Sequence, residues 1–303
     1  MNKRIIYVIA FSGGIDSFVT THMLLNKYGK QAEFYLVNFD INSEQTIPQK
    51  HASKLLYNWL KEQFPNSVIE YIQSKVRIQS DVVNTLHAGN EQSGLPFYFG
   101  SRNSVYAALL MGIGEAIARA KNLDKAYVEI RPVLGIHRHT TYRQYWDTTP
   151  AFAAVIRQLA SLNDMYTVRP EFPIITMEKS QILEYVWLHK LPYKYTWTCY
   201  KPEKVRETDT EVVFRPCQKC QACVERQKAI ENKIPGINNY ELTVPKSVTH
   251  TDSRIDSTIE AEGRRADTKS QKRKKKKKSR IELSVLQDKQ TDEAGELSST
   301  NNE

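Results

Sequence analysis

The sequence contains no apolar run long enough to cross a membrane, and the apolar stretch near its N-terminus is too short for a secretory signal. Cysteine is scarce, with four among 303 residues, and no aromatic residue follows Tyr240. The lack of a membrane span or signal leads us to expect a cytoplasmic protein, in which thiols stay reduced. The four cysteines therefore indicate a metal or catalytic role rather than disulfide bonds.

The segment after residue 245 is also poor in apolar residues and rich in charge. Residues 246–303 hold 14 Lys and Arg against 11 Asp and Glu, and so carry +3 of the net charge of +9. Its centre is the run Lys-Arg-Lys-Lys-Lys-Lys-Lys-Ser-Arg at residues 272–280. Like charges in a block repel one another, so we expect a disordered tail. The run suits weak contact with nucleic acid or an anionic surface, and equally a role in solubility alone.

The most informative stretch lies near the N-terminus, where apolar residues 5–11 are followed by Ser-Gly-Gly-Ile-Asp-Ser at residues 12–17. The apolar run suits a buried parallel strand, and helical spacing of apolar residues begins after the turn. This order aims backbone N–H groups and the positive end of a helix dipole at one place, where a phosphate can bind. No lysine follows the glycines, which excludes the P-loop of kinases and GTPases. A plain turn in which Asp16 or Ser17 caps the helix is the simpler alternative.

The turn resembles the PP-loop of ATP pyrophosphatases, which cut ATP between the α and β phosphates. In that family the loop holds the leaving pyrophosphate while an oxygen of the substrate attacks the α-phosphorus. The resemblance implies that ATP, together with Mg²⁺, is used by this chain. Such a site holds the anionic substrate and the phosphates of ATP close together, so it also needs cations. Lys179 and Arg102 are the candidates.

Strand and helix patterns alternate along the chain. This alternation predicts an α/β fold, a Rossmann-like parallel sheet flanked by helices. The cysteines near its end predict a small C-terminal helical region that is clamped by zinc. We expect a PP-loop domain at residues 1–175, a helical and cysteine-rich region at 176–245, and the tail at 246–303. The expected strands are residues 5–11, 33–39, 68–72, 126–130 and 172–175, and the expected helices are residues 49–63, 79–86, 150–162, 177–189 and one from 104 onward.

Several ordered motifs between about residues 3 and 231 resemble the QueC family of 7-cyano-7-deazaguanine (preQ0) synthases. They are the glycine turn, Phe39-Asp40 with Gln49-Lys50-His51, the loop that ends in Arg102-Asn103, Thr-Trp-Thr-Cys-Tyr at residues 196–200, and Cys-x2-Cys-x2-Cys at residues 217–223. The acidic substrate loop of the family is only faintly similar to residues 145–152. There the Cys-Arg-Pro-Glu of the family is Thr-Thr-Pro-Ala at residues 148–151.

The resemblance implies an ATP-dependent carbon–nitrogen ligase for queuosine-type 7-deazaguanine biosynthesis. ATP adenylates 7-carboxy-7-deazaguanine, ammonia displaces AMP to give an amide, and a second adenylation leads to the nitrile. The altered loop leaves three outcomes open: the nitrile synthase, an enzyme that stops at the amide, and a homologue that adenylates another substrate, such as a peptide or nucleic acid. The resemblance also implies a homodimer.

The resemblance further implies the residues of the site. Catalytic roles fall to Asp16, Ser17 and Lys179; ATP binding to Phe11, Ser12, Gly13, Gly14, Asp16, Ser17, Asp40, Arg102 and Asn103; and substrate binding to Tyr98, Arg102 and Asp147. The isolated histidines are assigned to packing or surface positions and given no catalytic role. They are His22, His87, His137, His139, His189 and His250.

Cys199, Cys217, Cys220 and Cys223 supply four thiolates, a complete tetrahedral set for a structural Zn²⁺ with no position left for water. An iron–sulfur cluster is the chemical alternative, because Cys-x2-Cys-x2-Cys also suits one. The 17 residues between Cys199 and Cys217 exceed the spacing in the family, which predicts an inserted hairpin around residues 206–214.

Two other classes of function remain open from the sequence. One is a PP-loop enzyme that modifies nucleic acid such as tRNA directly, to which the basic tail is suited. The other is a QueC-like protein that acts on a protein or peptide carboxyl group, or binds nucleotide without catalysis.

Overall fold

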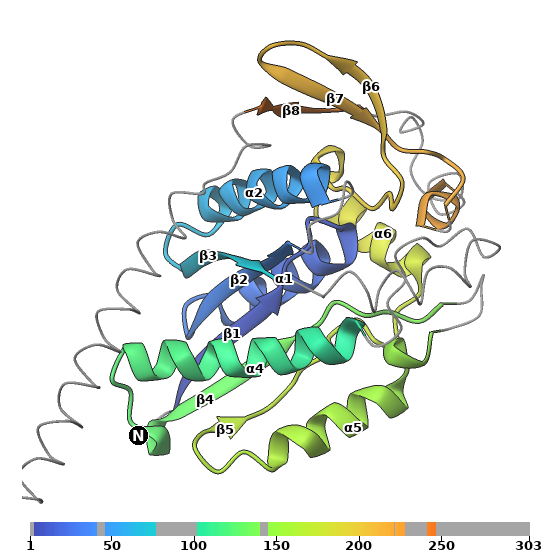
Figure 1. Ribbon diagram of the computed structural model, residues 1–303. Coiled ribbons are helices and arrows are strands. Elements are labelled where there is room, and N and C mark those ends of the chain that lie inside the picture. The colour runs from blue at the N-terminus through green and yellow to red at the C-terminus, as the bar shows by residue number, and fades with distance from the viewer. Residues whose placement is uncertain are drawn as a thin grey trace, which may run out of the picture. The chain divides into compact units, whose positions relative to one another are not determined.

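A five-stranded parallel sheet forms the centre of the computed structural model (Figure 1). The structure describes residues 3–40, 46–76, 102–139, 145–220, 222–227 and 241–246. The strands lie in the order β3-β2-β1-β4-β5, and each neighbouring pair is parallel. This order has its switch between β1 and β4, where ligands bind in open α/β sheets. The strands are β1 Arg4–Ala10, β2 Ala32–Asp40, β3 Val68–Lys75, β4 Val128–Val133 and β5 Thr167–Val168.

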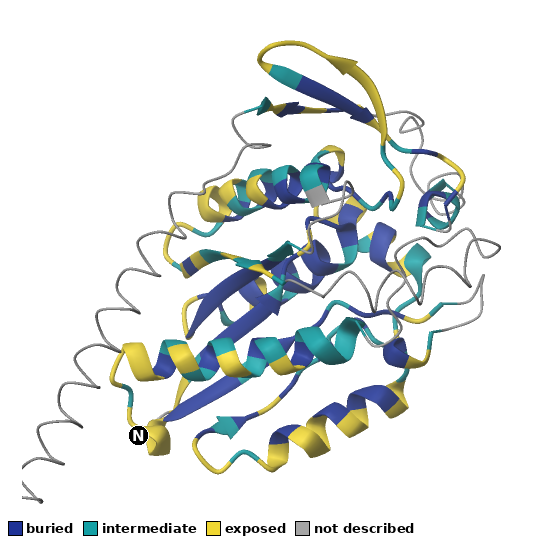
Figure 2. Cartoon of the chain, viewed as in Figure 1, coloured by how far each residue is buried: buried dark blue, intermediate teal, exposed yellow. Residues whose placement is uncertain are grey.

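Helices cover both faces of the sheet, which explains why β1 is apolar throughout rather than alternating. Tyr7 and Ile9 pack with one set of helices, α1, α2 and α6, whereas Ile6 and Val8 pack with α4 and α5. All four side chains are fully buried. Figure 2 shows the central strands buried and the helices exposed on their outer sides. The helices are α1 Ile15–Tyr28, α2 Thr46–Gln63, α4 Arg102–Ala120, α5 Pro150–Ser161 and α6 Lys179–Leu188.

The starts of α5 and α6 follow the usual rules for helix N-termini. Thr149 precedes α5, its hydroxyl accepts a hydrogen bond from the Phe152 N–H at 3.1 Å, and Pro150 occupies the first turn. At α6, Glu178 and Gln181 form a capping box. The capping box positions Lys179, the first residue of α6, at the edge of the sheet where the parallel strands end.

A second, three-stranded antiparallel sheet follows α6. Its strands are β6 Glu203–Glu207, β7 Glu211–Arg215 and β8 Leu242–Pro245, in that order across the sheet. The pairing of β6 and β7 confirms the hairpin expected around residues 206–214, whereas β8 was not predicted. Val212, Phe214 and Val244 pack with Trp197 and the four cysteines in a core of their own.

The structure confirms the expected α/β fold and moves most element boundaries by only a few residues. The strand expected at residues 172–175 is wrong: residues 173–176 form a turn, and the fifth strand is Thr167–Val168. Pro173 has no N–H for a strand ladder, and the apolar side chains of Phe172 and Ile174 are buried from the turn instead. The expected helix at residues 79–86, Tyr98 and the tail from residue 247 onward lie outside the described residues. None of the described helices combines the length and apolar character that crossing a bilayer requires.

Candidate active site

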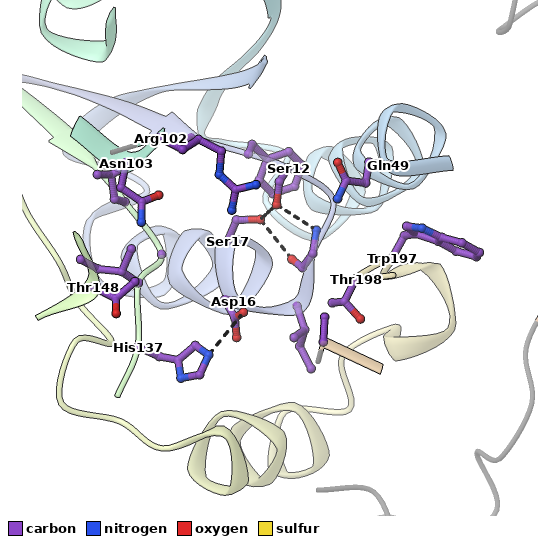
Figure 3. A pocket seen from close by; sticks show the side chains of 18 of the residues that line it. Ser12, Asp16, Ser17, Gln49, Arg102, Asn103, His137, Thr148, Trp197 and Thr198 are labelled. Carbon is purple, nitrogen blue, oxygen red and sulfur yellow. Dashed lines mark hydrogen bonds and ion pairs between the residues drawn. The ribbon is translucent and has the colours of Figure 1, made fainter. Parts of the chain in front are cut away.

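A pocket lies where β1, β2 and β4 end (Figure 3). Its wall includes the glycine turn after β1, the end of β2, the start of α4, the loop after β4 and the segment around Trp197. These segments are distant in sequence, and the parallel sheet brings them to one edge. The pocket therefore lies at the place that the sequence analysis expected for a phosphate ligand.

The glycine turn is tight because other segments press against it. Gly13 has a φ of +81°, and a Cβ there would lie 2.5 Å from the Gln49 carbonyl oxygen and 2.7 Å from the Ser53 nitrogen. A side chain at this position is excluded both by the left-handed backbone and by α2. The backbone N–H of Trp197 donates to the Gly13 carbonyl oxygen at 2.9 Å. The segment that leads to Cys199 therefore also holds the turn in place.

The turn leads directly into α1, whose N-terminus faces the pocket. Gly14 is the N-cap residue, and no side chain caps the helix, so the alternative in which Asp16 or Ser17 caps it is wrong. The Ser17 hydroxyl instead donates to the Gly14 carbonyl at 3.0 Å, and the Ser12 and Ser17 hydroxyl oxygens lie 3.2 Å apart. A helix N-terminus with two adjacent hydroxyl groups is suited to an anion.

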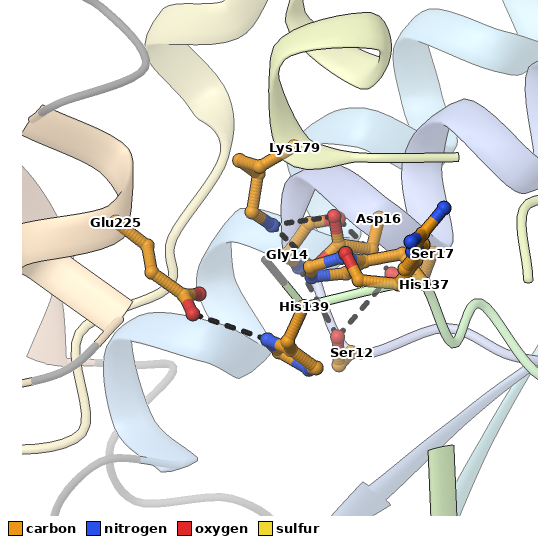
Figure 4. Close-up of polar contacts among 9 residues, drawn as sticks. Ser12, Gly14, Asp16, Ser17, His137, His139, Lys179 and Glu225 are labelled. Carbon is orange, nitrogen blue, oxygen red and sulfur yellow. Dashed lines mark hydrogen bonds and ion pairs between the residues drawn. The ribbon is translucent and has the colours of Figure 1, made fainter. Parts of the chain in front are cut away.

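Asp16 and Lys179, which both line the pocket, form an ion pair (Figure 4). The Lys179 ammonium donates to both oxygens of the Asp16 carboxylate, at 2.6 and 2.8 Å. Burial alone would raise the pKa of Asp16, but Lys179 and His137 outweigh it and lower that pKa below its ordinary value. Asp16 is thus a carboxylate at neutral pH, and the pair joins the first turns of α1 and α6.

A second polar cluster adjoins this pair and consists of His137, His139 and Glu225. His139 Nδ1 lies 3.1 Å from Glu225 Oε1, and the two imidazole rings have centroids 4.3 Å apart (Figure 4). His137 Nε2 lies 3.9 Å from Asp16 Oδ2. Burial and the Lys179 charge lower the pKa of His137 to about 4, so this imidazole is neutral at pH 7.

The sequence analysis gave these histidines no role, and it did not consider Glu225. A usable signal existed, because the spacing His-x-His in a loop after a strand puts both rings on one side of an extended backbone. Glu225 lies in a helical stretch at residues 222–227. Nothing in the local sequence connects that stretch to the loop after β4.

On another wall of the pocket, the start of α4 presents Arg102 and Asn103 (Figure 3). The Asn103 backbone N–H donates to Asp147 Oδ2 at 3.3 Å, and the Asn103 side-chain amide donates to the Asp147 carbonyl oxygen at 3.1 Å. Burial disfavours the charge of Arg102, but Tyr106, Tyr200 and Asp147 outweigh this effect and raise its pKa. The guanidinium is therefore a permanent cation of the pocket, separate from Lys179.

The pocket brings together most of the predicted site residues. Those that line it are Phe11, Ser12, Gly14, Asp16, Ser17, Arg102, Asn103, Asp147 and Lys179. Gly13 belongs to the turn but packs against α2 and does not line the pocket. Asp40 is the last residue of β2 and does not line it either. Tyr98 lies outside the described residues. His137, His139, Tyr200 and Glu225 line the pocket and were not predicted to do so.

The four cysteines form a compact buried cluster whose sulfur atoms all lie within 4.8 Å of one another. The Cys217 N–H lies 3.2 Å from the Cys199 sulfur, and the Cys220 N–H lies 3.3 Å from the Cys217 sulfur. Hydrogen bonds from Cys199 and Cys223 lower the pKa of the Cys220 thiol. Four close sulfurs with backbone N–H donors fit a tetrahedral metal site. Cys220 and Trp197 also line the pocket, so this cluster adjoins it.

The fold and the pocket together define a PP-loop protein, in which a glycine turn without a lysine occupies the phosphate position at the end of the first strand. A family model described as "Queuosine biosynthesis protein QueC" matches residues 6–234. The chain belongs to the QueC family, as the motifs of the sequence predicted.

Curated proteins named 7-cyano-7-deazaguanine synthase are similar to most of the chain. The protein from Prochlorococcus marinus (strain NATL2A) is 26% identical over 238 residues, which cover 74% of this chain and 92% of that protein. The protein from Leptospira biflexa serovar Patoc is 20% identical over 239 residues, which cover 73% of this chain and 88% of that protein.

Solved structures also show similarity. The U34-tRNA thiolase NcsA from Methanococcus maripaludis, solved with its [4Fe-4S] cluster, has a TM-score of 0.38 at 13% identity and covers 66% of this chain and 61% of its own. The NH3-dependent NAD synthetase from Campylobacter jejuni, solved with nitrate ion, has a TM-score of 0.32 at 13% identity and covers 65% of this chain and 71% of its own.

Proposed function

We propose that this protein is an ATP-dependent synthase that converts 7-carboxy-7-deazaguanine and ammonia into 7-cyano-7-deazaguanine. The reaction passes through an adenylated carboxylate and an amide. Membership of the QueC family and the names of the curated relatives support this substrate. The observation that carries the proposal is the glycine turn at the end of β1, with Lys179 and Arg102 in the same pocket.

The need for activation follows from the chemistry of a carboxylate. It is a poor electrophile, and transfer of AMP converts one of its oxygens into part of a good leaving group. The transfer brings the anionic acid against the triphosphate and releases pyrophosphate, so negative charge gathers in one place. We assign the pyrophosphate to residues 12–17 and to the N-terminus of α1. Lys179 and Arg102 balance the charge around the α-phosphate.

The Mg²⁺ that accompanies ATP would take the Asp16 carboxylate as its protein ligand, and it would supply charge neutralisation at the phosphates. Both oxygens of Asp16 contact the Lys179 ammonium, so the cation and the carboxylate form one unit at this position. Lys179 therefore positions Asp16, and it lines the same pocket as the glycine turn. This dual contact supports a catalytic role for the pair rather than a surface ion pair.

We assign substrate recognition to the part of the pocket lined by Asp147, the start of α4 and the ring of Phe39. Asp147 is buried, and Asn103 donates to its carboxylate and to its carbonyl oxygen, so the α4 start is coupled to this acidic residue. The Phe39 and Tyr106 rings stack with centroids 4.6 Å apart, and both residues line the same pocket. A flat bicyclic base with polar edges fits an aromatic wall beside an acidic group. Tyr98 remains a proposed substrate contact.

The altered substrate loop favours a second candidate, an enzyme that stops at the amide. Thr149, which stands where the family has Arg, is the N-cap residue of α5. Side chains used to start a helix are not available to bind the amide for a second adenylation. Adenylation of another carboxyl substrate is the remaining alternative, and the same assay distinguishes it.

We assign Zn²⁺ to the four-cysteine cluster, in a structural role. Four thiolates complete a tetrahedral shell and leave no open position, which is the pattern of structural rather than catalytic zinc. Metal analysis tests this assignment, and visible absorbance in anaerobically purified protein would indicate iron instead. We also infer a cytoplasmic homodimer, supported by the exposed apolar side chains of Val155, Leu159 and Leu162 on and beside α5.

The experiment that tests the proposed function is incubation of the pure protein with ATP, ammonia and 7-carboxy-7-deazaguanine, followed by mass spectrometry of the base. Nitrile is the expected product, and amide alone identifies the second candidate. Pyrophosphate release that depends on the acid is expected in either case. Absence of both products and of pyrophosphate excludes this substrate.

A further inference from the structure

We propose that His137, His139 and Glu225 form a second metal site, which binds a divalent transition-metal ion such as Zn²⁺ at the edge of the ATP pocket. This site is distinct from the four-cysteine cluster, and the proposal does not depend on the proposed function. Each of the three residues offers one ligand atom, and these atoms lie within 4.8 Å of one another. All three residues line the pocket, so an ion there would be reachable from it.

The hydrogen bonding of His137 prepares it as a ligand. Its Nδ1 lies 2.9 Å from the Arg138 carbonyl oxygen, which can only accept, so Nδ1 carries the proton and donates. In the neutral ring the lone pair is then on Nε2. The contact from Nε2 to Asp16 Oδ2 is 3.9 Å, too long for a hydrogen bond. A backbone carbonyl that fixes the tautomer through the far ring nitrogen is the usual support of metal-binding histidines.

The separation of His139 and Glu225 also fits a shared ion. Two ligands that each lie about 2.0–2.1 Å from one tetrahedral ion are about 3.3 Å apart. His139 Nδ1 and Glu225 Oε1 are 3.1 Å apart. A proton bridges this pair when the ion is absent, and the ion takes the place of that proton when it binds.

The surroundings favour a site with an open position. The side chains of His137, His139 and Glu225 are between 6% and 10% exposed, so the donors are largely shielded from solvent. Two imidazoles and a carboxylate are the donor set of catalytic zinc sites, which keep a coordination position for water or substrate. Imidazole donors also select transition ions over Mg²⁺. An anionic oxygen of a ligand in the pocket would fill the open position.

An ion-pair network without a metal is the competing explanation. In that case Glu225 only forms a hydrogen bond with His139, and His137 only packs beside it. That explanation predicts no affinity for a metal alone, whereas the proposed site binds Zn²⁺ or Co²⁺ without nucleotide or acid. Metal uptake therefore separates the two.

The test uses the full chain as purified, with its cysteine cluster loaded. We expect metal analysis after Zn²⁺ addition and desalting to give one equivalent more than the cysteine cluster holds. We expect added Co²⁺ to give the weak visible bands of nitrogen and oxygen ligands, without the intense near-ultraviolet thiolate bands of a cysteine site. His139→Gln and Glu225→Gln, made separately, should each lose this additional equivalent and keep the cysteine-bound metal.

His189→Ala is the matched control, because His189 is exposed and lies outside the cluster. It should keep the additional equivalent. The proposal is overturned if the unaltered protein takes up no additional Zn²⁺ or Co²⁺, or if the uptake survives both substitutions in the cluster. Product formation is not part of the readout, so an inactive protein that binds the second ion refutes the proposed function alone.

Discussion

At the scale of single residues, the pocket contains largely buried charged side chains that are stabilised by ion pairs. Asp16 and Lys179 come from the first turns of two helices that are 163 positions apart in sequence. Neither side chain is tolerable without the other, because an unpaired charge in a largely buried place costs several kcal/mol. Their distance from each other in the sequence makes the pair a product of the fold and not of a local motif.

Lys179→Ala should reduce acid-dependent pyrophosphate release about 100-fold or more, since loss of one charge-stabilising donor at a reacting centre has an effect of this size. The substitution also leaves Asp16 buried beside His137 without its main cation. Steady-state measurement of pyrophosphate release checks the prediction. Lys125→Ala, at an exposed position, is the control and should behave as the unaltered protein. An equal effect of both substitutions would remove Lys179 from the site.

His22 predicts a pH dependence of stability. Its side chain packs against Trp59, Phe64 and Tyr185, and burial, with His189 nearby, lowers its pKa from 6.5 to about 4. Between these two values the unfolded chain binds the proton and the folded chain does not. The contribution of His22 to the free energy of unfolding is therefore complete above pH 6.5 and falls as the pH decreases toward 4.

The size of this loss is about 3 kcal/mol at pH 4, from about 1.4 kcal/mol for each pH unit. His22→Gln keeps a hydrogen-bonding side chain toward Tyr185 without the titration. Denaturant unfolding at pH 7 and pH 4 should show a smaller loss of stability in this variant than in the unaltered protein. Identical losses would mean that His22 does not titrate in this range.

At the scale of elements, the cysteine cluster acts as a support for the phosphate turn. The backbone N–H of Trp197 donates to the Gly13 carbonyl oxygen. Two residues later along the chain, the Cys199 sulfur accepts a hydrogen bond from the Cys217 N–H. The packing of β7 and β8 against Trp197 completes this support. The cysteine cluster is thus coupled to the pocket through a few hydrogen bonds and one tryptophan.

Cys220→Ser should therefore weaken ATP binding as well as the fold. Metal binding to structural zinc sites is worth about 10–16 kcal/mol in isolated peptides, which exceeds the stability of many domains. We expect loss of the cluster metal, a lower melting temperature and weaker ATP binding by calorimetry. Lys219→Ala changes an exposed residue of the same loop and should keep all three properties. Retention of full ATP affinity in a metal-free Cys220→Ser protein would separate the cluster from the turn.

The sequence allowed the central sheet to be predicted because β1 and β2 are apolar on both faces, and this property is local. The strand predicted at residues 172–175 failed because apolar content does not reveal that Pro173 sits in a turn with its neighbours buried. Strand β8 was missed because its pairing with β7 joins segments separated by a long stretch of chain. The contact of His139 with Glu225 was missed for the same reason. Family motifs identified the turn and the cysteines, but not residues outside those motifs.

At the scale of the whole molecule, basic side chains occur both in the pocket and in the segment that follows β8. Residues 272–280 contain eight basic residues, whereas the family match ends at residue 234. A basic run outside the matched region is not needed to explain the chemistry of a small acid with ATP. Its charge suits contact with a polyanion or a role in solubility alone, and binding to a polyanion would weaken steeply with salt.

Removal of residues 247–303 tests whether these two sources of charge act separately. Lys246 is kept, because its side chain contacts Glu207 at 3.1 Å and its backbone pairs with Thr210. We expect turnover of the free acid to be unchanged and binding of tRNA or duplex DNA to be lost. In the full chain, the logarithm of the nucleic-acid affinity should fall linearly with the logarithm of the salt concentration, by about 0.9 for each phosphate neutralised on a duplex. A variant with the lysines of residues 274–278 changed to glutamine is the matched control for chain length, and it should also lose the binding. Truncation that lowers turnover of the free acid, with no such effect in the glutamine variant, would contradict this expectation. It would mean that the removed segment supports catalysis through residues other than the lysines.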